Sequence, residues 1–434
     1  MLRLTNLLKH AEKIKIRLNL GIAKAAAVFR FVPEGPRHAV RDWLIRITTP
    51  RRDRLSLGKR LRYPMGINEY GFFRAQIGLA QGAKIYAEAI KAAGIPCTFI
   101  NTDIIGHQED NSLNAELSRH GKYAINVIHV NPEQIRDVMN EHPYRMFNGH
   151  YNIGVWLWEL ETIPETWIPQ MKYVDEIWAP SEFIAKAIRK ETDKPVTVIP
   201  YGIETPVAPG GRKDFGLPEE EFLVLAMYDS RSRAARKNPE GAILAFHKAF
   251  GKGKEKAALV LKVANGTEEE IAALKRRINE LGIRCYLMTE QFSKPKLNTL
   301  IACCDVFLSL HRSEGFGLVI AEAMSLGVPV VATGWSANAE FMPENCTCRV
   351  GYRLIPVNGD YQHRDDSDRW AEPDLNEAAG YLRTLWAEPR TRREMAEEAA
   401  RHIREAYSME RCAERIGKRY EQICSQLKGR SGQI

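Results

Sequence analysis

The chain has 434 residues, a length that suits two α/β domains of roughly 150 to 200 residues each better than a single core. Hydrophobic residues make up 44% of it, and the absence of a long polar low-complexity tract argues against extensive disorder. The formal net charge of +8 is uneven, since residues 1–62 hold 16 Lys and Arg against 4 Asp and Glu. A basic extension on a mildly acidic body argues against a chain-wide nucleic-acid surface and indicates contact with an anionic surface or an arm-like contact.

Residues 1–62 are predicted to form a basic N-terminal extension. Apolar residues recur at helical spacing in its first part, at Leu4, Leu7, Leu8, Ala11, Ile14 and Leu18. Such a helix fits either an anionic membrane surface or the protein's own first domain. Because no signal-peptide core, membrane-spanning run or dense cysteine framework is seen, we expect a cytoplasmic protein, with peripheral attachment to the inner face of the cytoplasmic membrane as an option.

Residues 63–205 alternate short apolar strands with amphipathic helices, which predicts a Rossmann-like domain. The continuously apolar strands are typical of a parallel sheet buried on both faces. We expect the glycine-rich stretch 66–84, which includes Gly71, to be a loop that approaches substrate, or else an ordinary βα connection. The expected strands are 63–67, 97–100, 123–130, 152–158, 176–180 and 196–200, and the expected helices lie near 79–93, from Pro132 and after Ser181.

A stretch rich in proline and glycine, 200–211, separates this half from a second alternating series, and we place the second Rossmann-like domain at 206–390. After Pro373 the pattern turns helical and charged, and residues 391–434 are predicted to be C-terminal helices. The strands expected in the second domain are 222–228, 257–263, 285–288, 305–310 and 328–333, with helices from Pro239, Thr267 and about Gly317.

The strongest functional signal is HRSEGFGLVIAEAMSLGVPVVAT at 311–333, in which seven residues separate Glu314 from Glu322. Small residues after a strand let main-chain N–H groups approach a diphosphate or its sugar at the positive end of the next helix. We expect Glu314 to bind hydroxyls of a donor sugar and Glu322 those of a ribose; the alternative is a generic turn with solvated glutamates. The intervening residues expected at the donor are Gly315, Phe316, Gly317 and Leu318.

A basic loop at 227–241, MYDSRSRAARKNPEG, follows the first strand of the second domain, where doubly wound sheets bind ligands. Cleavage of a glycosyl diphosphate builds negative charge that fixed cations stabilise. We expect Lys237, together with Arg236 or Arg231, to do this without a metal, unless the loop is simply solvated. A metal-dependent transferase would show Asp-x-Asp at the end of an apolar strand, but the only nearby match, at 366–368, lies in a polar segment and is interpreted as a surface loop.

These segments resemble the retaining glycosyltransferase family 4, of GT-B architecture. The resemblance covers about residues 63–425. It implies an α/β fold with two Rossmann-like doubly wound domains facing a central cleft, followed by C-terminal helices. It also implies that Glu314 contacts the sugar, Glu322 the ribose, and Lys237 with a neighbouring arginine the diphosphate. The segments that carry it are Glu314 to Glu322, Lys237-Asn238-Pro239, GWSANAEFM at 334–342 and WAEPD at 370–374.

Two features of the first domain have open interpretations. The family resemblance implies that His129, at a strand end, touches the donor sugar, although a histidine there is equally typical of a hydrogen-bonded structural residue. The aromatic cluster in VWLWELETIPETW at 155–167, which contains Glu159, could stack on sugar rings, but a core position is favoured.

The function implied by the resemblance is transfer of a sugar from a nucleoside-diphosphate-sugar donor to a glycan or lipid-linked acceptor, with no cofactor, no metal and no nucleic-acid partner. The setting it implies is bacterial surface polysaccharide or lipopolysaccharide biosynthesis. Two alternatives stay open: a GT-B nucleotide-sugar epimerase, which would convert the donor without an acceptor, and a non-catalytic protein that binds a nucleotide or nucleic acid, which salt-dependent retention on DNA would reveal.

Overall fold

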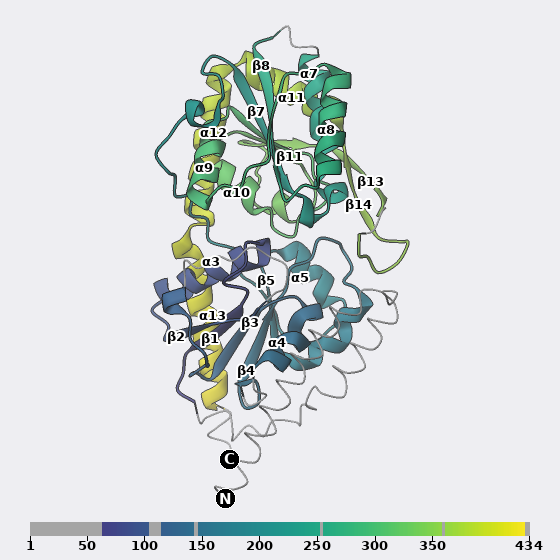
Figure 1. Cartoon of the computed structure of the whole chain (residues 1–434). Coiled ribbons are helices and arrows are strands. Elements are labelled where there is room, and N and C mark those ends of the chain that lie inside the picture. Colours follow the sequence, from purple (N-terminus) through teal and green to yellow (C-terminus); the bar gives the residue numbers. More distant parts are fainter. Residues whose placement is uncertain (1–62, 104–113, 143–145, 252–254, 358–360, 430–434) are drawn as a thin grey trace, which may run out of the picture. The chain divides into compact units, whose positions relative to one another are not determined.

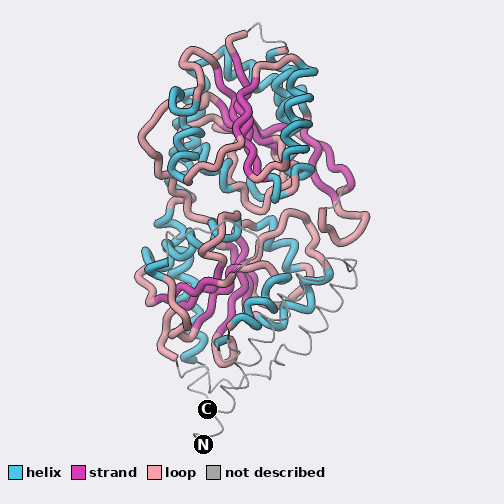
Figure 2. Tube along the Cα trace, in the orientation of Figure 1, coloured by secondary structure: helices cyan, strands magenta, loops and turns pink. Residues whose placement is uncertain are grey.

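The structure is a computed structural model that describes residues 63–103, 114–142, 146–251, 255–357 and 361–429 (Figure 1). The described chain forms two compact units. The first unit contains the residues up to Trp156, Thr166–Trp178 and the residues from Ala413 onward; the second contains Leu157–Glu165 and Ala179–Cys412. In each unit a twisted sheet has helices on both faces, as a doubly wound α/β fold requires (Figures 1 and 2).

The first sheet has six strands in the order β2-β1-β3-β4-β5-β6, and its pairs from β2 to β5 are parallel. The strands β1, β3, β4 and β5 are buried along their whole length, which for β3, β4 and β5 confirms the expectation drawn from their apolar runs. The strands are β1 (Ile67–Gly71), β2 (Cys97–Asn101), β3 (Ile125–His129), β4 (Tyr151–Val155), β5 (Glu176–Ala179) and β6 (Val196–Val198); the helices are α3 (Gly78–Ala92), α4 (Ile135–Glu141) and α5 (Glu182–Arg189), with 3₁₀ turns at Asn114–Glu116, Pro132–Gln134 and Glu165–Tyr173.

The start of the first sheet corrects the prediction. The first strand was expected at 63–67 but spans Ile67–Gly71, so the stretch 66–84 is a strand, a short connection and the first half of α3 rather than one loop. The strand was misplaced because Asn68 and Glu69 are polar, yet both are completely buried. Asn68 can lie inside the sheet because its hydrogen bonds are satisfied. The Glu69 carboxylate oxygens accept no hydrogen bond from any described residue, and His129 Nδ1 lies 3.4 Å from Glu69 Oε1.

An asparagine ladder satisfies Asn68. Asn68 pairs in register with Asn126 on β3, which pairs with Asn152 on β4. The side-chain amide of Asn68 donates to Asn126 Oδ1, and that of Asn126 donates to Asn152 Oδ1, both at 2.8 Å. Asn152 in turn donates to the main-chain oxygen of Phe147 at 2.9 Å. Thr98 on β2 donates to Asn68 at 2.9 Å, so one row of hydrogen bonds crosses four strands and fixes their register.

The second sheet has six strands in the order β12-β11-β10-β7-β8-β9. Its central strand β7 pairs with β8 in parallel from Phe222↔Ala257 to Asp229↔Ala264. The predicted helix starts are capped, since Asn238 accepts from Gly241 N and Thr267 from Glu270 N. The strands are β7 (Phe222–Asp229), β8 (Ala257–Ala264), β9 (Cys285–Met288), β10 (Val306–Ser309), β11 (Val330–Thr333) and β12 (Cys348–Val350); the helices are α6 (Ala234–Lys237), α7 (Pro239–Phe250), α8 (Glu268–Leu281), α9 (Lys294–Ala302) and α10 (Leu318–Ser325), with 3₁₀ turns at Arg212–Phe215, Ser230–Ser232 and Ala337–Glu340.

The chain after β12 contains a hairpin that the sequence pattern did not predict. Strand β13 (Tyr352–Pro356) pairs antiparallel with β14 (Arg369–Pro373), and the hairpin projects from the second unit (Figure 1). The expected C-terminal helices follow as α11 (Leu375–Ala387), α12 (Pro389–Ala406) and α13 (Met409–Gly429). Helix α13 begins in the second unit and continues into the first, because residues from Ala413 onward pack there.

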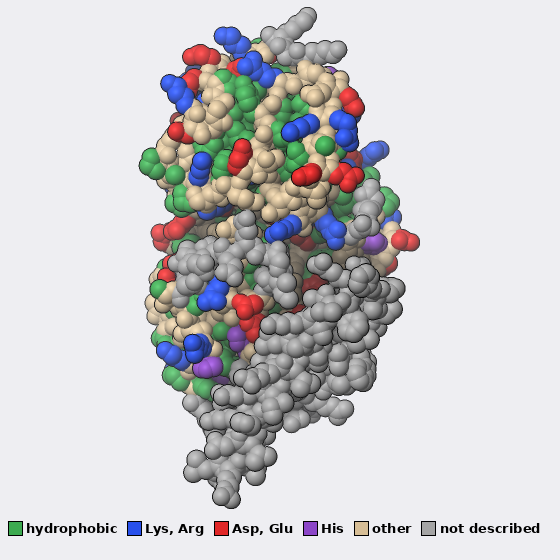
Figure 3. All heavy atoms as spheres, in the orientation of Figure 1, with side chains coloured by type: hydrophobic (Ala, Val, Ile, Leu, Met, Phe, Trp, Pro, Cys, Tyr) green, Lys and Arg blue, Asp and Glu red, His purple; other side chains and the backbone are tan. Residues whose placement is uncertain are grey.

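The described surface carries both signs of charge. Figure 3 shows Lys and Arg interspersed with Asp and Glu over the face drawn there. Within the described ranges, no helix is long and apolar enough to cross a bilayer. The predicted interfacial helix and basic run of residues 1–62 lie outside the described residues.

Candidate functional site

The turn between β10 and α10 carries Glu314, and glycine permits its shape. Gly317 has φ 93°, a left-handed conformation that favours glycine, and it caps α10. A side chain on Gly315 would start 2.8 Å from the carbonyl oxygen of Trp158. Phe316 is buried and its ring packs on Phe341, so it serves the core, whereas Leu318 begins the helix and is partly exposed.

Three charged side chains meet at the end of β10. Lys237 Nζ donates to Glu314 Oε1, and Arg236 Nη1 lies 3.4 Å from Glu314 Oε2. The amide of Glu314 donates to Ser336 Oγ at 2.8 Å. Burial raises the pKa of Glu314, but Lys237 and Arg236 outweigh it and lower the pKa to about 2. Glu314 is therefore a carboxylate held between two cations.

Hydrogen bonds of the Asn238 side chain hold the end of the basic loop beside Glu314. This residue adopts φ 52°, accepts from Gly241 N and donates to the main-chain oxygen of Leu310 at 2.8 Å. The bonds fix the junction of α6 and α7 against the end of β10, so Arg236 and Lys237 point at the same place. Burial lowers the pKa of Lys237, and Glu314 opposes that shift.

The structure distinguishes the two arginines that the sequence left open. Arg236 is only 5% exposed and lies with Lys237 at Glu314. Arg231 lies in the 3₁₀ turn Ser230–Ser232, where its side chain is exposed. The structure therefore groups Arg236, not Arg231, with Lys237.

Glu322 is buried on α10 and forms an ion pair with a lysine. Lys294 Nζ at the start of α9 is 2.5 Å from Glu322 Oε2. Burial raises the pKa of Glu322, and Lys294 only partly opposes this. A lysine in the first turn of a helix opposes the helix dipole, so its position is best explained by this pairing. No local sequence pattern indicates Lys294, because it lies in a different helix from its partner Glu322.

Comparison with protein families identifies the chain. Residues 181–416, more than half of the chain, match the family described as "Family 4 Glycosyltransferase in conflict systems". The chain belongs to this glycosyltransferase family. The match contains Lys237, Glu314 and Glu322, and no curated protein matches the chain.

Solved structures similar to this glycosyltransferase share its GT-B fold. Sucrose-phosphate synthase from Thermosynechococcus elongatus matches with TM-score 0.61 at 16% identity, over 83% of this chain and 100% of that one. Anabaena HepE in complex with UDP and glucose matches with TM-score 0.59 at 16% identity, over 82% and 100%. A glycosyltransferase from Rickettsia africae gives 0.59 at 13% identity, over 83% and 99%. Staphylococcus aureus TarM is longer, and this chain covers 55% of it.

Two predicted site residues of this glycosyltransferase, His129 and Gly71, are buried in the first unit. His129 has no exposed surface; its Nδ1 lies 3.4 Å from Glu69 Oε1 and its ring meets Tyr86 edge-on at 5.1 Å. Burial lowers the pKa of His129 to about 3. A Cβ on Gly71 would lie 2.9 Å from Ala83 Cβ on α3. Their burial favours the structural interpretation of both residues over donor contact.

A network of buried polar side chains surrounds the Glu314 turn. His311 Nε2 lies 2.9 Å from Asn338 Oδ1, and Asn338 donates to the main-chain oxygen of Thr333 at 2.9 Å. Ser336 adopts φ 70° and ψ −156°, a conformation that glycine favours and that costs about 1–3 kcal/mol in other residues. Sequence reasoning missed Ser336, since a serine carries no signal of backbone strain.

The Asp-x-Asp segment is not simply a surface loop. Asp366 is exposed, but Asp368 is buried and accepts from Thr162 Oγ1 and, at 2.6 Å, from Arg364 N. Both carboxylate oxygens of Asp368 thus accept hydrogen bonds from the protein itself. Among the described residues no group of three or more His, Cys, Asp or Glu could hold a metal ion.

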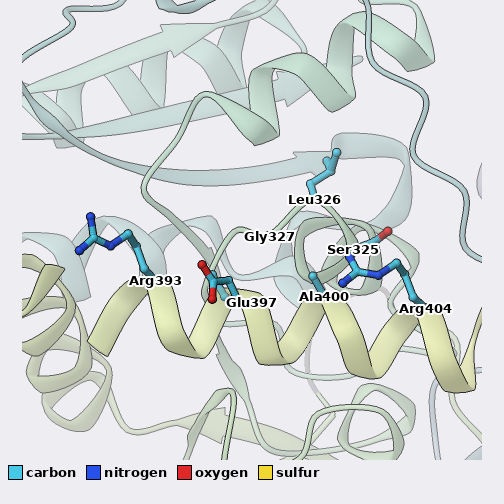
Figure 4. A pocket seen from close by; sticks show the side chains of 8 residues that line it. Ser325, Leu326, Gly327, Arg393, Glu397, Ala400 and Arg404 are labelled. Atoms are coloured by element: carbon cyan, nitrogen blue, oxygen red, sulfur yellow. The ribbon is translucent and has the colours of Figure 1, made fainter. Parts of the chain in front are cut away.

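A separate hollow of about 350 Å³ lies in the second unit between the end of α10 and α12 (Figure 4). It contains none of the predicted site residues, and its charged side chains project from α12. The lining consists of Ser325, Leu326, Gly327, Arg393, Ala396, Glu397, Ala400 and Arg404.

Proposed function

We propose that the protein is a retaining glycosyltransferase that uses a nucleoside-diphosphate sugar as donor substrate. The observation that carries this proposal is the group formed by Glu314, Lys237 and Arg236 at the carboxyl end of β10. As the bond from the anomeric carbon to the diphosphate breaks, Lys237 and Arg236 stabilise the charge on the leaving oxygens. The acceptor hydroxyl then attacks the face that the diphosphate leaves, which retains the anomeric configuration.

Glu314 has two tasks in this proposal. Without donor it offsets the charge of two cations that face one another, and with donor it accepts hydrogen bonds from sugar hydroxyls. Because its pKa is lowered to about 2, it stays an acceptor at neutral pH. Glu322 binds the ribose hydroxyls, with Lys294 compensating the buried charge.

Metal independence is part of the proposal, since Lys237 and Arg236 already supply positive charge beside Glu314. Turnover is expected to survive EDTA. Complete loss on chelation that Mn²⁺ or Mg²⁺ restores would contradict it.

The acceptor is proposed to be a glycan or lipid-linked molecule, approached through residues 1–62 at an anionic membrane surface, as in surface polysaccharide assembly. Sedimentation with anionic and neutral vesicles, for the full chain and for a chain starting at Leu61, tests the membrane part. Equal binding by both chains, or none by either, would exclude it.

The first experiment is a screen of UDP-, GDP- and ADP-sugars for thermal stabilisation, beginning with UDP-glucose because Anabaena HepE was solved with it. A donor at 100 times its Kd adds about 2.7 kcal/mol. Retention is read from the anomeric configuration of the product. Conversion of the donor without an acceptor would instead identify an epimerase.

Site variants test the assignment with that donor. Glu314→Ala and Lys237→Ala should each lower turnover about a hundredfold or more, because each removes a preorganised charge. The exposed Arg231→Ala serves as the control in the same loop. Near-normal turnover of a folded Glu314 or Lys237 variant would overturn the site.

A further inference from the structure

Residues 157–165 follow β4 in the chain but belong to the second unit, where they pack against the Glu314 turn. Ser313 Oγ donates to the main-chain oxygen of Glu159. The carbonyl oxygen of Trp158 occupies the space beside Gly315 that a side chain would need. Both neighbours of Glu314 in the chain therefore contact this segment.

Glu159 shares Arg236 with Glu314. Its Oε1 lies 3.6 Å from Arg236 Nη2, while Arg236 Nη1 lies 3.4 Å from Glu314 Oε2 and donates to the main-chain oxygen of Ser313 at 2.8 Å. Arg236 is 5% exposed, and burial alone would lower its pKa, but Glu159 first and Glu314 second raise it. The guanidinium is held at both Nη groups, while its buried Nε makes no hydrogen bond.

Tyr361 fixes Glu159 in turn. The Tyr361 hydroxyl donates to Glu159 Oε2 at 2.8 Å. The ring lies 5.6 Å from the ring of Trp370 and 6.2 Å from that of Trp158. Burial raises the pKa of Tyr361 well above 10, so the hydroxyl keeps its proton at neutral pH and remains a donor.

We propose that Glu159 is a positioning residue of the transferase site: it holds the Arg236 guanidinium in the orientation in which its free Nε–H meets the donor diphosphate, and Tyr361 orients Glu159. The inference rests on the proposed function, because it assigns the diphosphate as the ligand of Arg236. A cation fixed before the reaction needs no reorganisation as charge develops on the leaving group.

The charges of the site predict that removing the charge of Glu159 lowers the catalytic rate without weakening the binding of a diphosphate. Glu159 and Glu314 offset Arg236 and Lys237, so removing the charge of Glu159 leaves a net positive site that attracts a diphosphate more strongly. It also frees the guanidinium to rotate, so a bound diphosphate no longer meets Nε–H in the productive geometry. A residue with a merely structural role would weaken binding and rate together.

The variants are Glu159→Gln, Tyr361→Phe, their double variant, and Glu161→Gln as a matched control, since Glu161 is an exposed carboxylate in the same segment. Glu159→Gln should lower kcat about tenfold, which corresponds to about 1.4 kcal/mol, with UDP bound as tightly as by the wild type or more tightly. Tyr361→Phe should lower kcat about threefold, and the double variant should be no slower than Glu159→Gln, because both act through one group. Additive losses, weaker UDP binding, or equal losses in Glu161→Gln would overturn the proposal.

A readout without substrate separates this proposal from the proposed function. In the ¹⁵N-arginine NMR spectrum, rotation about the Nε–Cζ bond of Arg236 should be slow in the wild type and in Glu161→Gln, and faster in Glu159→Gln and Tyr361→Phe. If these differences appear but no nucleoside-diphosphate sugar binds or reacts, the proposed function fails and the positioning of Arg236 stands. If the wild type transfers sugar and the rotation is equally fast in every variant, the positioning fails and the function stands.

Discussion

Glu314 keeps its charge across the neutral pH range although it is almost buried, because Lys237 and Arg236 lower its pKa to about 2. A lowered carboxylate pKa gives stability that is present above the unfolded pKa of about 4.3 and is lost as pH falls through the folded value. The difference in unfolding free energy between wild type and Glu314→Gln should therefore be constant from about pH 6 to 8 and shrink below about pH 4. Urea denaturation at each pH measures it, and a difference that grows on acidification would contradict the pairing.

His129 should also reduce stability on acidification, but because burial favours its neutral form rather than because a partner favours its charged form. Burial lowers its pKa to about 3, so between that value and about 6.5 the unfolded chain binds the proton and the folded chain does not. Wild-type stability should fall relative to His129→Gln by about 1.4 kcal/mol per pH unit as pH drops through this window. Turnover per folded molecule should stay near normal at pH 7. A large drop in kcat, with stability differences independent of pH, would restore His129 to the donor site.

At the scale of elements, the Glu314 turn depends on the contact between Gly315 and the segment 157–165. Gly315→Ala would place Cβ 2.8 Å from the carbonyl oxygen of Trp158, and we expect it to cost about 1–3 kcal/mol. Gly380→Ala on the exposed face of α11 is the matched control, since nothing lies within 4 Å of its Cβ position, and it should gain about 0.4–1 kcal/mol. Thermal unfolding of both variants tests this. Equal shifts would show that the contact is not tight.

The elements that the sequence predicted correctly are those whose signals are local. Buried parallel strands such as β7 and β8 appear as apolar runs, and the caps Asn238 and Thr267 mark helix starts. Strand β1 was misplaced because Asn68 is satisfied by residues on other strands, which no local pattern records. The hairpin β13–β14 was missed because β13 is largely exposed and alternates poorly.

The same limit applies to the site. Glu314, Glu322 and Lys237 lie in local motifs, from which they could be predicted as site residues, and the structure brings Glu314 and Lys237 together. Glu159 and Lys294 act through partners far away in the chain, and their roles depend on tertiary contacts. For His129 the sequence left donor contact and a structural role open, and its burial favours the structural role, which a strand end does not reveal.

At the scale of the whole molecule, α13 is the element through which the C-terminus joins both units. It starts in the second unit, and its residues from Ala413 onward pack in the first. There Arg419 pairs with Glu176 on β5, with Nε and Nη2 each 2.7 Å from a carboxylate oxygen. Glu176 has no exposed surface and also accepts from Tyr151 and Trp178. The last helix is thus tied to the first sheet by a buried ion pair.

Breaking this pair should destabilise the first unit selectively. Arg419→Met leaves the charge of Glu176 buried without a cation, which typically costs about 3–5 kcal/mol. Lys418→Met is the matched control, because Lys418 is an exposed cation on the same helix. Calorimetry should show a lower unfolding temperature only for Arg419→Met, and hydrogen exchange should rise first in β5 and α13. Adding Glu176→Gln should recover part of the loss, since the uncompensated charge is then gone. If Arg419→Met and Lys418→Met unfold alike, the helix is held to the first sheet by apolar packing instead.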